Sequence, residues 1–257
     1  MTVSRRDFLK VLGVAGLAGV AGGLTPPIIR YIMPPIPEQH PFPRTKLVWE
    51  DGSPVKASEL EVNASYIFAY PLVNTPNFLL NLGDENGNPV SIPEAEIPLM
   101  MDPLNEESVL FKRTDSRVEI GKISGIGGTY LFPGGVGPNR SIVAYSAICQ
   151  HFACYYPAMR YFPPGVSPPN PPSEEVAKGA VIFCSCHGSA YDPYRGAVVL
   201  TSPAASPLPA VVLEWDKDTD ELWAVKVVGA TITGKFCNTC GKPEELVGDT
   251  TVVRKVL

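Results

Sequence analysis

Most cysteines and histidines of this chain lie in two short stretches, residues 149–154 and 184–191. Together the stretches hold four of the six cysteines and two of the three histidines. The first reads Cys-Gln-His-Phe-Ala-Cys and the second reads Cys-Ser-Cys-His-Gly-Ser-Ala-Tyr. Thiolates and imidazoles are the side chains that bind borderline and soft transition metals most readily. Each histidine therefore indicates a metal ligand rather than an isolated structural residue, and the metal centre would be built from two loops.

Three kinds of site use residues of these types. A Cys₂His₂ zinc site usually takes its two cysteines from one segment and its two histidines from another, whereas each stretch here holds a mixed set. Disulfide bonds alone are common in exported domains, but they leave the paired histidines without a role. An iron–sulfur cluster with two cysteines on one iron and two histidines on the other uses both residue types from both stretches. The residues favour this third site.

The elements that must position these loops read as β-strands. Residues 141–145 and 180–183 precede the two stretches and are rich in β-favouring residues. Further candidates are residues 66–70 and 78–82, and a hairpin in which residues 211–215 and 221–225 flank a polar turn. No segment after residue 45 shows convincing helical periodicity. Residues 163–172 are expected to form an exposed polyproline loop. The 23 glycines and 28 prolines also suit a loop-rich, mainly β protein.

The two stretches resemble the Cys-x-His-x-Gly-Cys and Cys-Pro-Cys-His-Gly-Ser motifs of respiratory Rieske proteins, the electron-transfer subunits of cytochrome bc-type complexes. Ala153 stands where glycine is usual in that family, and Ser185 stands where proline is usual. The high proline content and the acidic head look more like archaeal members than mitochondrial ones. The resemblance implies an antiparallel β head with an inserted cluster-binding subdomain over about residues 141–210.

The resemblance also assigns roles to individual residues. It implies that four residues hold one 2Fe–2S cluster, namely Cys149, His151, Cys184 and His187. It implies a disulfide between Cys154 and Cys186 that holds the loops together. Two further residues contact the cluster in this reading: Ser189 donates to a bridging sulfide, and Tyr191 donates to the sulfur of Cys149. Both donors favour added negative charge and should raise the reduction potential. The segment 203–205 resembles the proline loop that covers the cluster in the family.

Histidine ligands would add proton chemistry to this site. An imidazole that binds iron through one nitrogen leaves the other nitrogen free to titrate. Reduction lowers the charge of the cluster and should therefore raise the pKa of that nitrogen, which couples the electron to a proton. His151 and His187 are accordingly the expected catalytic pair, and the family pattern makes His187 the partner of a quinol.

The N-terminal segment has a different character. Arg5 and Arg6, followed by an apolar pair, resemble a twin-arginine export signal within a cytoplasmic n-region, residues 1–10. The apolar run after it is long enough, at about 1.5 Å per residue, to cross a bilayer, so we expect a transmembrane anchor over residues 11–33. A cleaved signal peptide is the alternative. Residues 34–45 read as a proline-rich hinge, and residues 46–257 as an exterior Rieske domain.

These features predict a membrane-anchored Rieske subunit of a quinol-oxidising oxidoreductase complex in aerobic respiration. It would take an electron, coupled to a proton, from quinol beside a cytochrome b-type subunit and pass it to a cytochrome or copper protein. The positive-inside bias places the chain in the cytoplasmic membrane as a single-pass protein, with its N-terminus inside and its head on the outer face. The alternative is the Rieske small subunit of an arsenite-oxidase-type molybdoenzyme. A net charge of −5 argues against a nucleic-acid partner.

One cysteine pair lies outside this scheme. Cys237 and Cys240 are spaced as Cys-x-x-Cys, which suits a redox-active pair, half of a zinc site or a local disulfide. Because an exported head meets an oxidising environment, we expect the local disulfide.

Overall fold

The structure is a computed structural model, and it describes residues 42–101, 125–230 and 245–256. A compact unit begins at Phe42 and contains all of these residues. The predicted export signal, the predicted anchor and most of the predicted hinge lie outside the described residues, as do Cys237 and Cys240. Within the described ranges, no helix has the length and apolar character needed to cross a membrane.

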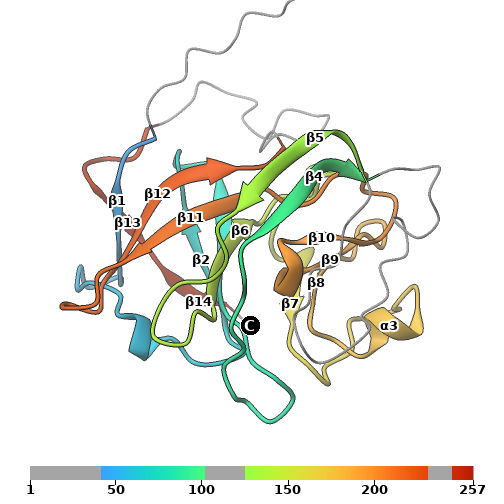
Figure 1. The fold of residues 1–257 in the computed structure, drawn as a ribbon, viewed down its shortest axis with the longest axis horizontal. Coiled ribbons are helices and arrows are strands. Elements are labelled where there is room, and N and C mark those ends of the chain that lie inside the picture. Colours follow the sequence, from blue (N-terminus) through green and yellow to red (C-terminus); the bar gives the residue numbers. More distant parts are fainter. Residues whose placement is uncertain (1–41, 102–124, 231–244, 257) are drawn as a thin grey trace, which may run out of the picture. The chain divides into compact units, whose positions relative to one another are not determined.

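The larger of the β-sheets has eight strands (Figure 1). In spatial order they are β13 (Thr250–Val252), β1 (Thr45–Val48), β12 (Leu222–Val228), β11 (Ala210–Trp215), β6 (Ile142–Ser146), β3 (Pro76–Asn81), β2 (Ser65–Ala69) and β14 (Arg254–Val256). All neighbours are antiparallel except β1 and β13, which run parallel. The hairpin expected around the polar turn is formed by β11 and β12.

The central strands of this sheet are buried on both faces. Phe78 and Leu80 of β3 pack into one hydrophobic core, whereas Leu79 between them packs into the other. In β6, Val143 and Tyr145 likewise face the first core. This alternation follows from the period of two along a strand, in which successive side chains point to opposite faces. The first core is the one that continues toward the metal-ligating loops.

A second, four-stranded antiparallel sheet is inserted between β6 and β11, which are themselves neighbours in the large sheet. Its strands, in spatial order, are β10 (Val198–Thr201), β9 (Ala190–Asp192), β8 (Val181–Cys184) and β7 (Met159–Phe162). Figure 1 shows them in yellow and orange, apart from the strands of the large sheet. Ile182, Tyr191 and Val198 of this sheet share the first core with Phe78 and Tyr145, so the small sheet is anchored through buried side chains.

The remaining elements are short. The strands β4 (Ala95–Met101) and β5 (Gly125–Phe132) form a separate two-stranded antiparallel sheet. In the described part of the chain, helix is confined to α3 (Glu174–Ala177) and two 3-10 turns, η1 (Ala57–Glu59) and η2 (Pro193–Arg195). The helix α3 begins directly after the proline-rich stretch, where the Ser173 hydroxyl accepts a hydrogen bond from the Val176 amide and caps its first turn. The head is thus mainly β, as expected.

The last residues assigned to the hinge lie against the head. The Tyr70 hydroxyl donates to the Pro43 carbonyl over 3.0 Å. The Arg44 guanidinium lies 3.7 Å from the centre of the Trp223 ring and pairs with Glu214 over 2.8 Å. Since β1 already begins at Thr45, these contacts make residues 42–45 part of the folded head.

Candidate metal centre

The two predicted ligand stretches form tight loops at the ends of strands. The first follows β6, and it is closed by hydrogen bonds from the Cys149 amide to the Cys154 carbonyl and from the Ala153 amide to the Cys149 carbonyl. The second begins at Cys184, the last residue of β8, and leads into β9. It is closed by the bond from the Gly188 amide to the Cys184 carbonyl. Backbone hydrogen bonds within each loop therefore hold its closed conformation.

The four predicted ligands divide into a buried pair and an outer pair. Cys149 and Cys184 are free thiols with only 2% and 1% of their surface exposed. His151 is half-buried and His187 is exposed. The two imidazole rings lie nearly perpendicular, with their centres 4.9 Å apart. The structure thus places the sulfur ligands on the interior side and both histidines on the outer side of one site.

The two thiols lie close enough to hydrogen-bond to each other. This bond with Cys184 lowers the pKa of Cys149 to about 5, and hydrogen bonds from Tyr191 and Ser189 act in the same direction. The same thiol–thiol bond raises the pKa of Cys184, and burial adds to that effect. One thiol of the pair ionises readily while the other keeps its proton. Only a cation placed between them would stabilise both as thiolates, which is the form that binds metal.

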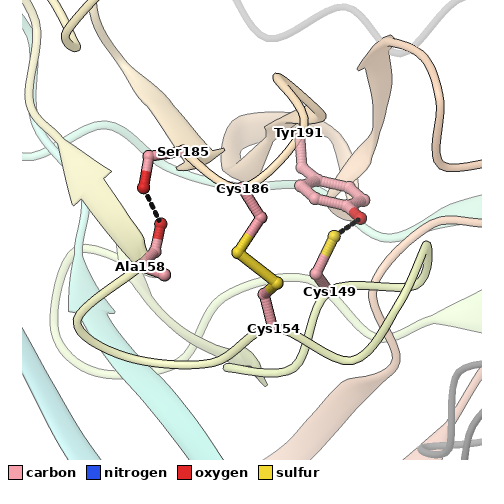
Figure 2. Close-up of a disulfide and its surroundings, with 6 residues drawn as sticks. All are labelled: Cys149, Cys154, Ala158, Ser185, Cys186 and Tyr191. Atoms are coloured by element: carbon pink, nitrogen blue, oxygen red, sulfur yellow. Dashed lines mark hydrogen bonds between the residues drawn. A yellow bond between two sulfur atoms is a disulfide. The ribbon is translucent and has the colours of Figure 1, made fainter.

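Tyr191 of β9 is positioned to donate to the sulfur of Cys149 (Figure 2). Its hydroxyl oxygen lies 3.3 Å from that sulfur and already accepts a hydrogen bond from the Gln150 amide. Burial raises the pKa of Tyr191 well above its usual value, so the phenol stays protonated. With its oxygen occupied as an acceptor, its O–H group is left to point at the sulfur.

Ser189 connects the site to the segment that resembles the proline loop. Its buried hydroxyl oxygen accepts a hydrogen bond from the Ala204 amide over 3.0 Å. Thr201 makes a second connection by donating to the Gly188 carbonyl. These two bonds hold residues 201–204 against the second ligand loop. Sequence reasoning did not indicate the Ala204 and Thr201 contacts, because one partner in each hydrogen bond is a backbone group, which no residue type marks.

The disulfide between Cys154 and Cys186 is present and joins the two loops (Figure 2). The sulfurs of Cys154, Cys184 and Cys186 all lie within 4.8 Å of one another. Two of these sulfurs are bonded to each other and are not thiolates, so this trio is not the ligand set of the oxidised protein. The free thiols in the described ranges are those of Cys149 and Cys184.

Ser185 adds a non-covalent connection between the same two loops. Its amide and its hydroxyl both donate to the carbonyl of Ala158, over 2.8 and 3.0 Å. Figure 2 shows the hydroxyl bond on the side of the disulfide away from Cys149. Proline at this position would have neither donor. The departure at Ser185 therefore strengthens the attachment of the loops.

These residues fit a 2Fe–2S cluster with two thiolate and two imidazole ligands. The donor set of two buried thiols and two adjacent imidazoles is the one that such a cluster requires. The Nδ1 atom of His151 is buried without a hydrogen-bond partner among the described residues. A buried nitrogen in that state is costly unless it has a ligand to bind, so it suits a metal-binding atom.

Comparison with known proteins agrees with this fit. The family model described as the Rieske [2Fe-2S] domain matches residues 103–212 of the chain. The structure is also similar to the soluble domain of Rieske protein II (soxF) from Sulfolobus acidocaldarius. The two are 29% identical, the match covers 72% of this chain and 78% of that one, and the TM-score is 0.44. The family match identifies a Rieske 2Fe–2S electron-transfer domain in this chain, and such a domain holds one 2Fe–2S cluster.

Replacing Tyr191 with phenylalanine should lower the reduction potential of the cluster. The lost hydrogen bond stabilises the reduced, more negative state more than the oxidised state. A difference on the order of 1 kcal/mol corresponds to about 40 mV for one electron. A redox titration followed by circular dichroism measures this shift. Tyr145→Phe is the matched control, because that buried hydroxyl donates to the Pro193 carbonyl. Equal potentials for the Tyr191 variant and the wild type would exclude the donor role.

Replacing Ala153 with glycine should stabilise the first loop. Ala153 has a φ of +58°, in the left-handed region where a Cβ costs about 1–2 kcal/mol. The greater conformational freedom of glycine in the unfolded chain offsets part of this effect. The net increase in the free energy of unfolding is on the order of 0.5–1 kcal/mol. The midpoint of thermal unfolding should therefore rise. Ala158→Gly, at a position without positive φ, should lower the midpoint. A lower midpoint for Ala153→Gly would contradict this account.

Proposed function

We propose that this protein is a membrane-anchored electron-transfer subunit that takes one electron, coupled to a proton, from quinol. It then passes the electron to a cytochrome or copper protein. The observation that carries the proposal is the arrangement of the two imidazoles. His151 and His187 converge at the outer side of the site, where His187 is exposed, while both thiols are buried. A partner molecule therefore meets the histidines first.

The surface around the histidines suits a ring that is apolar with polar edges. Phe152 is 45% exposed, and its ring centre lies 3.8 Å from that of His151 and 5.5 Å from that of His187. Tyr155, 63% exposed, follows in the same loop. A quinol has an aromatic ring that can pack on such side chains and hydroxyl groups that can donate to an imidazole. This combination of groups supports quinol as the reductant.

The roles of the protein groups follow from their positions. A bound 2Fe–2S cluster supplies one-electron redox chemistry at iron with histidine ligands. His187 offers its free ring nitrogen to a quinol hydroxyl and takes the proton as the electron leaves the quinol. Tyr191 and Ser189 hold the interior side of the site through hydrogen bonds to Cys149, and burial keeps water from that side. Proton exchange is thereby confined to the outer, histidine side.

The proposed membrane anchor and partners are supported by the sequence. The apolar segment 11–33 would hold the head at the outer face of the cytoplasmic membrane, and residues 34–41 would link the two. Quinol dissolved in that membrane would reach the histidines at a cytochrome b-type subunit. Extraction of the full-length chain from membranes by detergent but not by alkaline carbonate would support this placement. Release of the full-length chain by carbonate would contradict it.

Replacing Phe152 with alanine tests the quinol surface. The variant should slow quinol-dependent reduction of the cluster by about tenfold, the equivalent of about 1.4 kcal/mol of lost apolar contact. The measurement is stopped-flow absorbance of the full chain in its detergent-solubilised complex. Reduction by dithionite should stay complete, which shows that the cluster is retained. Val166→Ala is the control, since Val166 is similarly exposed at 48% but lies in the proline-rich stretch. Failure of any quinol to reduce the wild-type cluster would reject the proposal.

A further inference from the structure

The second ligand loop contains a backbone position with unusual freedom. Gly188 lies between the exposed predicted ligand His187 and the buried hydroxyl of Ser189. Its φ is +86°, in the left-handed region that favours glycine. Apart from its chain neighbours, no atom of the described residues lies within 4 Å of the place that a Cβ on Gly188 would take. Side-chain packing therefore does not fix this position, and hydrogen bonds have to hold it.

Two hydrogen bonds restrain Gly188. Its amide donates to the Cys184 carbonyl, which closes the loop. Its carbonyl accepts from the Thr201 hydroxyl over 2.9 Å. The first bond does not restrain the next peptide group, because that planar group consists of the Gly188 carbonyl and the Ser189 amide. The Thr201 hydroxyl therefore holds the peptide group that joins Gly188 to Ser189.

The Thr201 side chain projects from a backbone that is itself well held. Thr201 is the last residue of β10, and it pairs with Ala190 at the start of β9. The register shifts between Val199 and Thr201, as at a β-bulge, and bulges beside functional sites re-aim side chains. Val199 and Leu200 are both buried. Packing and strand pairing thus set the position from which the hydroxyl reaches the ligand loop.

The segment after Thr201 is held at two further points. The Ala204 amide donates to the Ser189 hydroxyl oxygen over 3.0 Å, and the Ala205 carbonyl accepts from the Met101 amide over 2.7 Å. Because the Ser189 oxygen serves as an acceptor here, its O–H group is available to donate in another direction. The resemblance to Rieske proteins directs that donation to the cluster.

We propose that Thr201 is a positioning residue for the metal centre. By holding the Gly188 carbonyl, it stops the peptide group between Gly188 and Ser189 from rotating and so fixes the direction of the Ser189 donor. A donor with a fixed direction favours the added negative charge of the reduced cluster, so Thr201 should raise the reduction potential. Thr201 acts through the backbone and without contacting the cluster. The proposal does not depend on quinol being the reductant.

Replacing Thr201 with valine tests the proposal, because valine keeps the branched shape of threonine and lacks the hydroxyl. In the cluster-loaded, full-length chain, the ratio of reduced to oxidised cluster at a fixed ambient potential should fall about threefold, which corresponds to part of one hydrogen bond. At about 59 mV per tenfold change for one electron, the potential falls by roughly 30 mV. A redox titration followed by circular dichroism measures it. The EPR lines of the reduced cluster should broaden, because the donor then takes several directions.

Thr251→Val is the matched control. The Thr251 hydroxyl also donates to a backbone carbonyl, that of Ala69, over 2.7 Å, but its strand β13 pairs with β1 and not with a ligand loop. Both valine variants should unfold at a lower temperature, and only Thr201→Val should change the potential and the EPR lines. Thr201→Ser keeps the donor and should match the parent protein in both. An unchanged potential in Thr201→Val, or an equal shift in Thr201→Ser or Thr251→Val, would overturn the proposal.

The rate of cluster loss decides the case in which Thr201→Val does not keep its cluster through purification. The decay of visible absorbance in freshly isolated protein measures this rate. We expect several-fold faster loss from Thr201→Val than from the parent, and the parent rate in both Thr201→Ser and Thr251→Val. Equally fast loss from either of these two variants would show a general loosening of the head, and it would overturn the positioning role of Thr201.

Discussion

The disulfide between Cys154 and Cys186 joins two loops, and the geometry of the metal centre depends on that link. Its half-cystines are 32 residues apart, and closing a loop of that length removes unfolded-state entropy worth roughly 3.5–4 kcal/mol. The link brings two thiols to the interior and two imidazoles to the surface from segments that enter from different strands. Hydrogen bonds from Ser185 to Ala158 reinforce it, because they extend the β7–β8 pairing beside the bridge.

The hydrophobic core also positions the hydrogen-bond donor that contacts Cys149. Tyr191 pairs with Ile182 across β9 and β8, and both side chains lie in the core that also contains Phe78 and Tyr145. A buried tyrosine in a sheet has few rotamers open to it. Its hydroxyl therefore reaches the sulfur at a position set by packing against the large sheet. The chemistry of the site is positioned by residues that never contact the metal.

Features marked by residue type could be predicted from the sequence. Contacts made by backbone groups, and strands too short to show a pattern, could not. Strands such as β3 and β11 were found, because runs of apolar and β-branched residues mark buried strands. The three-residue strands β13 and β14 are too short to show a period. The predicted ligands lie together in one site, and they could be identified from the sequence because metal binding requires cysteine and histidine side chains. Ala204 and Ala158 contribute only backbone groups, so nothing in their side chains marks them. The anchor, the quinol and the outer partners stay predictions.

Burial divides the site into two sides with different physics. On the inner side, Cys149 lies away from water and close to the hydroxyls of Tyr191 and Ser189. Electrostatic effects are strong in such surroundings, so the inner side sets the preference for an added electron. On the outer side, His187 is exposed beside Phe152, and the proposed function assigns proton exchange and the docking of a partner to this surface. Because separate loops and strands supply the two sides, a substitution at Phe152 can alter partner choice while the potential stays fixed by β9.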